Sequence, residues 1–375
     1  MIKYHQMLST VTTDGLEMKL VERDMPEPKP HEIVLQVEAT PINPSDHGVM
    51  FGWADISQAT STGSGVNRVL RAPLAPGGLA RMKARLGQDL PVGNEGAGVV
   101  VAAGSDDYAQ SLIGKRVAAM GGGMYGSYRA VPAMNALPLP ESATSRDGAS
   151  CFVNPLTALC FVETMRGEGH TALVHTAAAS NLGQMLNRIC QGEGIDIVNV
   201  VRKDAQVELL KGMGAKYVVN SSDDDFQMQL TDAIHATGAT LGFDAIGGGD
   251  MASKILLAME AAAARTPGAY SIYGSIAHKQ VYSYGSLDFS PTVLNRAYGM
   301  AWGVGGWLLP NFLAKAGMET AVRLRKRVAA ELHTTFASHY TDEISLSEAL
   351  DADIVRRYNA KKTGEKFLIN PSLDL

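Results

Sequence analysis

The sequence lacks most features that mark secreted, membrane or nucleic-acid-binding proteins. It has three cysteines in 375 residues and no C-x-x-C pair, so a disulfide framework is not expected. No run approaches the roughly 18 to 20 apolar residues of a membrane span, and the first residues lack the apolar core of a signal peptide. We therefore expect a cytoplasmic protein with reduced core thiols.

An excess of positive charge is also missing. The formal net charge is −5, and the absence of a basic run or face argues against a nucleic-acid partner. Apolar residues make up 46% and charged residues 19% of the chain, as in an ordinary soluble enzyme. A chain of this length exceeds the usual size of one hydrophobic core, so two domains are expected.

Two patterns divide the chain. Up to about Val131, short strands such as 32–39, 96–101 and 116–119 alternate with Pro- and Gly-containing turns, which predicts a small β-barrel-like domain. From about Thr144, strands alternate with helices, which is typical of a doubly wound parallel sheet in an α/β fold. The expected strands of that sheet are 171–174, 195–201, 216–220, 241–244 and 269–273.

The tail that begins at His339 ends in an expected strand, 366–369, and we expect it to return to the first domain. The predicted domains are therefore 1–145 with 335–375, and 146–334. Residues 57–90 form a long connection with one expected helix, 79–86. Connections of that length are either functional lids or flexible insertions, and both interpretations stay open here.

Residues 171–215 resemble a nucleotide-binding βαβ unit. An apolar strand leads into the small-residue turn 177–183, which opens an amphipathic helix. Small residues let a backbone approach a pyrophosphate, and the helix N-terminus then holds the anion. The glycine fingerprint of such turns is poor here, because only Gly183 of its three glycines is present. The turn residues expected to contact the cofactor are Ala179, Ser180, Asn181 and Leu182.

The second strand of this unit ends at Arg202 and Lys203, where a Rossmann unit contacts the adenosine ribose. An acidic side chain there would bind the ribose 2′-hydroxyl, whereas two cations suit a 2′-phosphate. The pattern predicts NADP(H) as the cofactor. The alternative is that either cation belongs to an ordinary solvated loop.

Motifs in the same order along nearly the whole chain carry a family resemblance. They are Asn43-Pro44-Ser45-Asp46, Gly93-Asn94-Glu95-Gly96, Asn154-Pro155-Leu156-Thr157, the turn 177–183, Phe243-Asp244-Ala245-Ile246 and Ile272-Tyr273-Gly274-Ser275. Together they resemble the medium-chain dehydrogenase/reductase superfamily, specifically its zinc-free quinone oxidoreductase and enoyl reductase branch. The resemblance implies a GroES-like β-barrel catalytic domain made from both chain ends, a Rossmann domain between them, and an active site in the cleft.

The same resemblance implies roles for single residues. Asn43 and Thr157 would sit beside the nicotinamide carboxamide as the catalytic candidates. Further cofactor-binding residues would be Asn220 and Ile246, followed by Tyr273, Gly274 and Ser275. Two structural interpretations stay open, because an Asn before a proline is a common turn former and Thr157 can be a helix-entry residue.

The resemblance also bears on metal binding. In the alcohol dehydrogenase branch, zinc ligands would include a Cys in the segment of Asn43 and the His of a Gly-His-Glu motif. Here that segment has no Cys and Asn94 replaces the His, which leaves only His47 and Glu95. A catalytic zinc needs three protein ligands, so no metal is expected and His47 is interpreted as a pocket-wall or hydrogen-bonding residue.

Without a Lewis acid, nothing stabilises the alkoxide of an alcohol oxidation. Hydride transfer from NADPH to a quinone or an activated C=C bond (an enone) needs only positioning and desolvation. We therefore expect an NADPH-dependent quinone or enone reductase with a small-molecule acceptor, and the resemblance favours a homodimer.

Two other functions stay open. A 2-enoyl thioester reductase, for CoA or acyl-carrier substrates, is weakened because no tyrosine occurs in the stretch 51–55, after the Asn43 motif. A non-catalytic NADPH-binding protein is supported by the absence of any residue that must act as acid or base.

Overall fold

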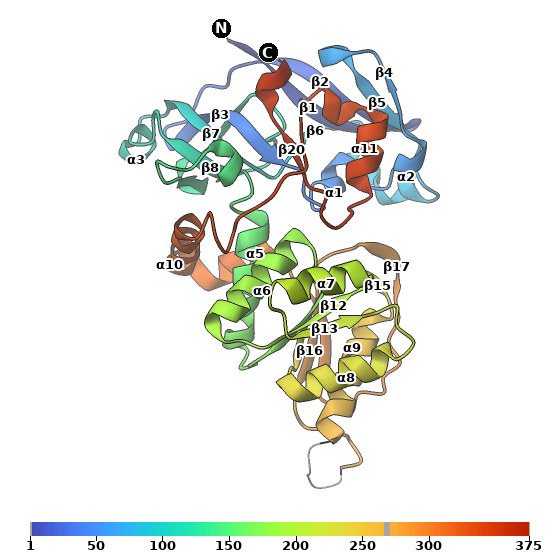
Figure 1. Ribbon diagram of the computed structural model, residues 1–375. Coiled ribbons are helices and arrows are strands. Elements are labelled where there is room, and N and C mark those ends of the chain that lie inside the picture. The colour runs from blue at the N-terminus through green and yellow to red at the C-terminus, as the bar shows by residue number, and fades with distance from the viewer. Residues whose placement is uncertain (1, 266–270, 375) are drawn as a thin grey trace. The chain divides into compact units, whose positions relative to one another are not determined.

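The computed structural model describes residues 2–265 and 271–374. The chain forms two compact units (Figure 1): unit 1 is Met1–Val153 with Arg325–Leu375, and unit 2 is Asn154–Leu324. The divisions differ from the expected boundaries at 145 and 335. One coincides with the start of a helix at Val153 and the other falls inside a helix, Leu309–Ala330, and neither leaves a compositional signal in the sequence.

Unit 1 consists mainly of antiparallel strands. Its strands are β1 (Lys3–Thr12), β2 (Gly15–Asp24), β3 (Glu32–Pro41), β4 (Thr60–Thr62), β5 (Val69–Ala72), β6 (Asp89–Pro91), β7 (Glu95–Ala103), β8 (Arg116–Met120), β9 (Tyr128–Pro132), β10 (Ala136–Pro138), β19 (Asp342–Ile344) and β20 (Phe367–Ile369). Its short helices are α1 (His47–Met50), α2 (Gly78–Arg81), α3 (Asp107–Gln110), α4 (Ser145–Gly148) and α11 (Ala352–Asn359). One sheet has the strand order β4-β5-β2-β1-β6 and the other β10-β8-β7-β3-β20-β19.

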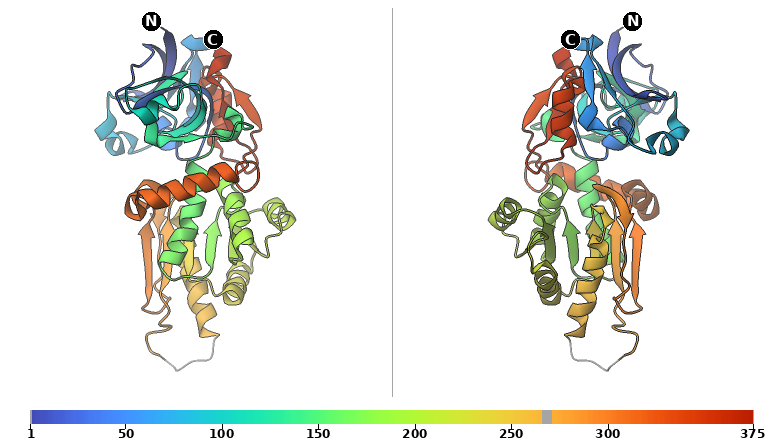
Figure 2. Two further views of the ribbon diagram at one scale, coloured as in Figure 1. Left: turned by 90° about the vertical axis from the view of Figure 1, so that its left-hand side faces the viewer. Right: turned by 90° about the vertical axis from the view of Figure 1, so that its right-hand side faces the viewer.

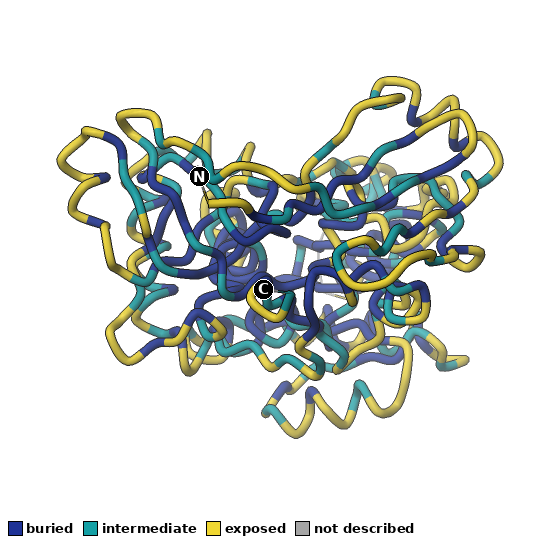
Figure 3. The backbone as a smooth tube through the Cα atoms, turned by 90° about the horizontal axis from the view of Figure 1, so that it is seen from above, coloured by how far each residue is buried: buried dark blue, intermediate teal, exposed yellow. Residues whose placement is uncertain are grey.

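Both chain ends contribute to unit 1. β20 pairs antiparallel with β3, Leu368 opposite Pro41 and Ile369 opposite Thr40, so the tail enters the sheet that the N-terminal segment begins. Side chains of β1, β2 and α11 share one apolar core, which includes Met7, Met18 and Val355. The buried and exposed stretches of the backbone can be followed in Figure 3.

The connection 57–90 contains paired strands. β5 pairs antiparallel with β2, β4 pairs with β5, and β6 pairs with β1, so the segment widens one sheet of unit 1. The expected helix 79–86 is broken into α2 and a 3₁₀ turn, Lys83–Arg85. The sequence pattern missed these strands because each is only three or four residues long.

Unit 2 is a parallel sheet with helices on both faces (Figure 2). The strands of unit 2 are β11 (Leu173–Thr176), β12 (Ile197–Val201), β13 (Tyr217–Asn220), β14 (Leu241–Asp244), β15 (Gly247–Gly249), β16 (Lys279–Ser283), β17 (Asp288–Thr292) and β18 (Trp302–Gly306). The helices are α5 (Val153–Gly167), α6 (Asn181–Glu193), α7 (Asp204–Gly212), α8 (Phe226–Thr237), α9 (Met251–Ala264) and α10 (Leu309–Ala330), with a kink at Gly317 in α10 and its last turns in unit 1.

The sheet order is β13-β12-β11-β14-β16-β18, and every pair in it is parallel. α8 and α9 pack on the face that carries Val174 and Val198. α5 and α6 pack on the other face, where Phe161 meets Phe243 and Asn187 bonds Asn199. The predicted fold class, a doubly wound α/β sheet with a second β domain, is confirmed.

One expected strand, 269–273, is not observed among the residues that the structure describes. Residues 269 and 270 lie outside the described residues, and residues 271–273 form a turn. The strand of this part of the sheet is β16, which starts at Lys279. The shift matters for the site, because it changes which residues follow the strand.

Candidate functional site

The turn between β11 and α6 lies at the carboxyl edge of the unit 2 sheet, where Rossmann units bind phosphates. The Ser180 hydroxyl caps α6 by accepting a hydrogen bond from the Gly183 amide at 3.2 Å. A Cβ on Gly183 would lie 2.1 Å from the Ala178 carbonyl oxygen, so only glycine lets the helix pack this closely. Ala177 adopts a left-handed φ of 52°. The turn is therefore as tight as a glycine-rich one, although it has a single glycine.

The predicted contact residues of this turn are placed in two ways. Ala179 and Leu182 are buried, so only their backbone can face a ligand. Ser180 and Asn181 are partly exposed at the start of α6. The first amides of a helix lack intrahelical partners and carry the positive end of its dipole, so this end of α6 favours an anion.

Arg202 and Lys203 directly follow β12 at the same edge, and both are exposed. Within residues 2–265 and 271–374, neither side chain is in an ion pair with a carboxylate. The nearby acid, Asp204, accepts a hydrogen bond at 2.9 Å from Asn220 Nδ2. Asn220 thus fixes the start of α7, where the exposed carboxylate of Asp204 follows the two cations.

The turn after β14 is held by a buried carboxylate. Asp244 accepts a hydrogen bond from Thr176 Oγ1 at 2.7 Å, which ties β14 to β11. The backbone amides of Ile246 and Gly247 each donate to Asp244 at 3.0 Å. Ile246 is therefore fixed at the carboxyl edge of the sheet, next to the strand that leads into the α6 turn, and its contact with a cofactor stays a prediction.

Thr157 lies in the first half of α5 and is buried. One turn later, Phe161 stacks on Phe243 with ring centroids 3.8 Å apart and contacts Tyr284. Three residues after the C-terminal end of α5, His170 Nδ1 lies 2.7 Å from Thr240 Oγ1, and Thr240 directly precedes β14. α5 therefore runs antiparallel to the strands, and Thr157 lies toward their carboxyl edge. Asn43 and Thr157 belong to different units, so their meeting at one nicotinamide stays a prediction.

The placement of Tyr273, Gly274 and Ser275 corrects the sequence analysis. They precede β16, and Ser275 donates to Glu260 near the end of α9, with its amide at 2.8 Å. Lys279, the first residue of β16, also donates to Ser275. These contacts put the triplet at the amino edge of the sheet, opposite the α6 turn, so it does not border the same cofactor site.

A second Tyr-Gly-Ser triplet, Tyr284-Gly285-Ser286, follows β16 and lies at the carboxyl edge instead. The Tyr284 amide donates to the Asp244 carbonyl at 3.0 Å, and a Cβ on Gly285 would meet the Ala245 carbonyl oxygen at 2.6 Å. The strand before the second triplet contains the strand-forming residues Val281 and Tyr282. Tyr270 and Ile272 stand before the first triplet as well, so residue type alone does not decide between the two.

In unit 1, the Asn43 motif is organised around Asp46, which is buried. One carboxylate oxygen accepts from the Asn43 amide at 2.7 Å and the other from the Asn94 amide at 2.8 Å. Burial, and to a smaller extent the Glu95 charge, raises the pKa of Asp46 to about 7. Asp46 therefore shapes the loop that presents Asn43.

The Asn43 side chain is held at both ends of its amide. Nδ2 donates to Glu95 Oε1 at 2.7 Å, and Oδ1 accepts from Lys366 Nζ at 3.1 Å. The other oxygen of Glu95 accepts from the Phe152 and Val153 amides, at 2.8 and 3.0 Å. Burial lowers the pKa of Lys366 to about 8 and raises that of Glu95. Sequence reasoning missed Lys366, because 323 residues separate it from Asn43.

His47 is a wall residue of the unit 1 core. Its ring contacts Phe51 at 5.1 Å and Tyr358 at 6.0 Å between centroids, and burial lowers its pKa to about 3. Nowhere in the described chain do three or more His, Cys, Asp or Glu side chains gather so as to hold a metal ion. Glu95 is the other residue that remains of the zinc-ligand motif. Its carboxylate accepts hydrogen bonds from the Asn43 side-chain amide and from the backbone amides of Phe152 and Val153.

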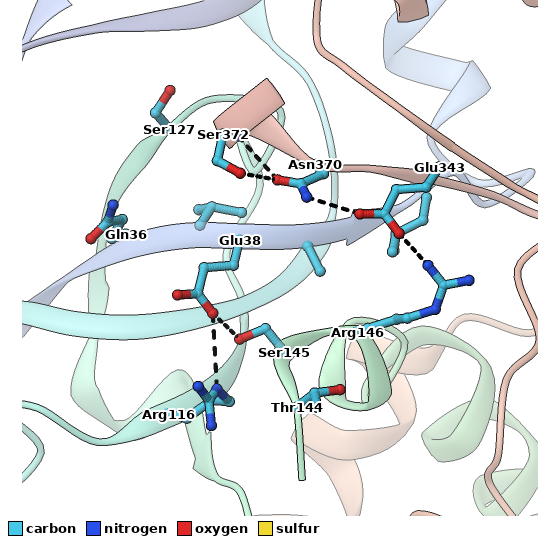
Figure 4. A pocket seen from close by; sticks show the side chains of 13 residues that line it. Gln36, Glu38, Arg116, Ser127, Thr144, Ser145, Arg146, Glu343, Asn370 and Ser372 are labelled. Carbon is cyan, nitrogen blue, oxygen red and sulfur yellow. Dashed lines mark hydrogen bonds and ion pairs between the residues drawn. The ribbon is translucent and has the colours of Figure 1, made fainter. Parts of the chain in front are cut away.

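A cavity of about 380 Å³ lies elsewhere in unit 1, between β3, α4 and the tail (Figure 4). Its charged side chains pair with each other: Arg146 with Glu343, and Arg116 with Glu38. Ser145 also donates to Glu38. None of the predicted site residues lines this cavity, and its charges are already compensated, so we do not assign the function to it.

Comparisons with known proteins agree with this geometry. A family model described as zinc-binding dehydrogenase matches residues 182–298. Prostaglandin reductase-3 of Mus musculus is 28% identical over 159 residues, which are 42% of this chain and 41% of that protein. The synaptic vesicle membrane protein VAT-1 homolog of Homo sapiens is 29% identical over 168 residues, which are 44% of this chain and 42% of that protein. A solved structure described as a putative NADPH:quinone reductase from Mesorhizobium loti covers 99% of both chains with 25% identity and a TM-score of 0.75.

Proposed function

Because the chain shares the fold and part of the sequence of the medium-chain dehydrogenase/reductase superfamily, we propose that it is an NADPH-dependent reductase of a quinone or an enone. The curated relatives named above are matched over less than half of their own length, so the activity is inferred from the site. The observation that carries the proposal is the pair Arg202 and Lys203, exposed beside the capped turn of α6.

The residues of this chain fit NADPH as follows. The α6 turn, with Ser180 and Asn181 at its exposed side, would hold the pyrophosphate. Arg202 and Lys203 would bind the 2′-phosphate through charge-assisted hydrogen bonds. Ile246 would border the nicotinamide, and Asn43 and Thr157 would orient its carboxamide. NADPH supplies the hydride when it is bound, and the protein positions and desolvates the two reactants.

Cofactor preference tests the proposal. We expect a lower Michaelis constant for NADPH than for NADH, because each charge-assisted bond to the 2′-phosphate contributes roughly 1.5 to 3 kcal/mol. Replacing Arg202 and Lys203 together by Ala should raise the NADPH constant by more than about tenfold and leave NADH nearly unchanged. Lys211→Ala, at the far end of α7, is the matched control and should change neither. Equal constants for both cofactors would refute the assignment.

The acceptor is tested with the wild-type protein. NADPH oxidation is followed with a panel of quinones, enones and crotonyl-CoA, and we expect turnover with the first two classes. Preferred turnover of crotonyl-CoA would instead identify a 2-enoyl thioester reductase. NADPH binding without oxidation by any acceptor would identify a non-catalytic binding protein.

The proposal includes a homodimer in the cytoplasm. Cys151, Cys160 and Cys190 are free and buried, which suits a reducing compartment. No helix of the described chain is long and apolar enough to cross a membrane. Sedimentation equilibrium of the purified protein tests the dimer, and a monomer mass at micromolar concentration would contradict it.

A further inference from the structure

The Asn43 amide lies between a cation and a carboxylate, both in unit 1. Lys366 directly precedes β20 and Glu95 is the first residue of β7, so side chains from the starts of two neighbours of β3 converge on a residue that closely follows β3. An ammonium group can only donate hydrogen bonds, and an ionised carboxylate can only accept them. Turning the Asn43 amide over would place donor against donor and acceptor against acceptor. The two partners therefore admit one orientation of the amide.

Each contact leaves part of the amide's bonding capacity unused. Oδ1 has a second lone pair beyond the one that Lys366 occupies, and Nδ2 has a second N–H beyond the one given to Glu95. One donor and one acceptor with fixed positions are the complement of a primary carboxamide, which itself offers one of each. Nicotinamide carries such a group.

We propose that Lys366 is a positioning residue for the cofactor. By fixing the orientation of the Asn43 amide, it determines where the donor and the acceptor for the nicotinamide carboxamide lie. This rests on the proposed NADPH function, and it names a residue that neither the family resemblance nor the sequence motifs single out. Lys366 acts through Asn43, so it need not touch the cofactor.

The surroundings of Lys366 make its charge sensitive to pH. The charged groups that face it are Glu95 of β7 and Asp46 of the Asn43 loop, which both favour the protonated form, while burial favours the neutral form. The Tyr340 ring lies 5.9 Å from Nζ. The net pKa of about 8 means that the ammonium is present at neutral pH and is lost as the pH rises through 8. A neutral amine no longer enforces the amide orientation, because it can also accept.

The test compares two ligands that differ by one group. NADP⁺ contains nicotinamide, whereas 2′-phospho-ADP-ribose has the same phosphates and riboses without it. In Lys366→Met, which keeps much of the length of the side chain, we expect the NADP⁺ affinity to fall about tenfold, as for one hydrogen bond. The affinity for 2′-phospho-ADP-ribose should stay within about twofold. Lys366→Arg should restore NADP⁺ binding, and Lys362→Met, an exposed lysine of the same tail, should change neither affinity.

A titration of the wild-type protein tests the same proposal without a variant. The ratio of the two affinities cancels the titration of the shared phosphates, so we expect the preference for NADP⁺ to decline as the pH rises through about 8. The proposal would be overturned if Lys366→Met lost affinity equally for both ligands, or if the ratio of the two wild-type affinities did not change with pH. Lys366 would then be assigned to the stability of unit 1. If the wild-type protein binds neither ligand, the NADPH function itself fails.

Discussion

Gly183 offers a sharp test of the cofactor turn, because its substitution by Ala sets two effects against each other. Within a helix, Ala is favoured over Gly by about 1 kcal/mol. At this position, however, the new Cβ would lie 2.1, 2.6 and 2.8 Å from the oxygen, carbon and Cα of Ala178, which are all backbone atoms. Backbone cannot rotate away, so α6 must move off β11, and overpacking of this kind costs about 1 to 3 kcal/mol or more. Because three backbone atoms lie under 3.0 Å from the new Cβ, we take the upper end of this range, about 3 kcal/mol, and the clash then wins with a net loss of about 2 kcal/mol.

Gly192 is the matched control in the same helix. It is exposed, and a Cβ there would meet nothing within 4 Å, so Gly192→Ala should gain up to about 1 kcal/mol. The two variants should thus differ by about 3 kcal/mol, which corresponds to roughly 6 to 12 °C in melting temperature for a unit of this size. Trp302 and Trp307 report on unit 2 by fluorescence during the melts. A Gly183→Ala protein that is as stable as Gly192→Ala would refute the reasoning.

Three further predictions concern the turn, the Asp46 loop and metal. Ala177→Gly should stabilise the protein by about 0.5 kcal/mol, because relief of the left-handed φ gains about 1 kcal/mol or more and the greater flexibility of Gly in the unfolded chain offsets part of that gain. Ala178 does not have a positive φ, so Ala178→Gly should destabilise the protein in the same melts. The raised pKa of Asp46 means that the folded state binds its proton more tightly than the unfolded state, so this group's contribution to stability is full below about pH 4 and is lost as the pH rises through about 7. The unfolding free energy of Asp46→Asn, measured by urea titration, should therefore improve relative to wild type by about 1.4 kcal/mol for each pH unit across that window, and parallel curves for the two proteins would show that Asp46 does not titrate there. Metal analysis of the purified protein should find no stoichiometric zinc, and a chelator should leave NADPH oxidation unchanged; about one zinc per chain would overturn the metal-free mechanism.

Much of unit 2 could be predicted from local patterns. The strand 241–244 is observed with the same bounds, and the strands before it shift by at most two residues, because buried parallel strands are continuous apolar runs that periodicity detects. The fold class is confirmed, and the expected resemblance agrees with the dehydrogenase family model over residues 182–298 and with the solved structure described as a putative NADPH:quinone reductase. The exception is 269–273, where a motif is interpreted without its strand. Two Tyr-Gly-Ser triplets lie eleven residues apart, and among the described residues only the second follows a strand.

The unit 1 part of the site could be predicted only in outline. The Asn43 and Glu95 motifs are visible in the sequence, but their hydrogen bond and the arrival of Lys366 depend on how β20 pairs with β3. Such pairing joins residues that are hundreds of positions apart, and no local propensity encodes it. The same reason explains the segment 57–90, whose short strands are stabilised by β2 and not by their own sequence.

The pairing of β20 with β3 also determines when each unit can be completed during synthesis. Unit 2 is one uninterrupted stretch of chain, so all of its strands have emerged from the ribosome before the last strand of unit 1 is made. Unit 1 begins first, and β3 pairs early with β7 and β9, yet Thr40 and Pro41 at its end have their partners in β20, near the end of the chain. Chains that stop early would therefore carry a finished nucleotide-binding unit and an open sheet edge, which is a ready substrate for chaperones and proteases.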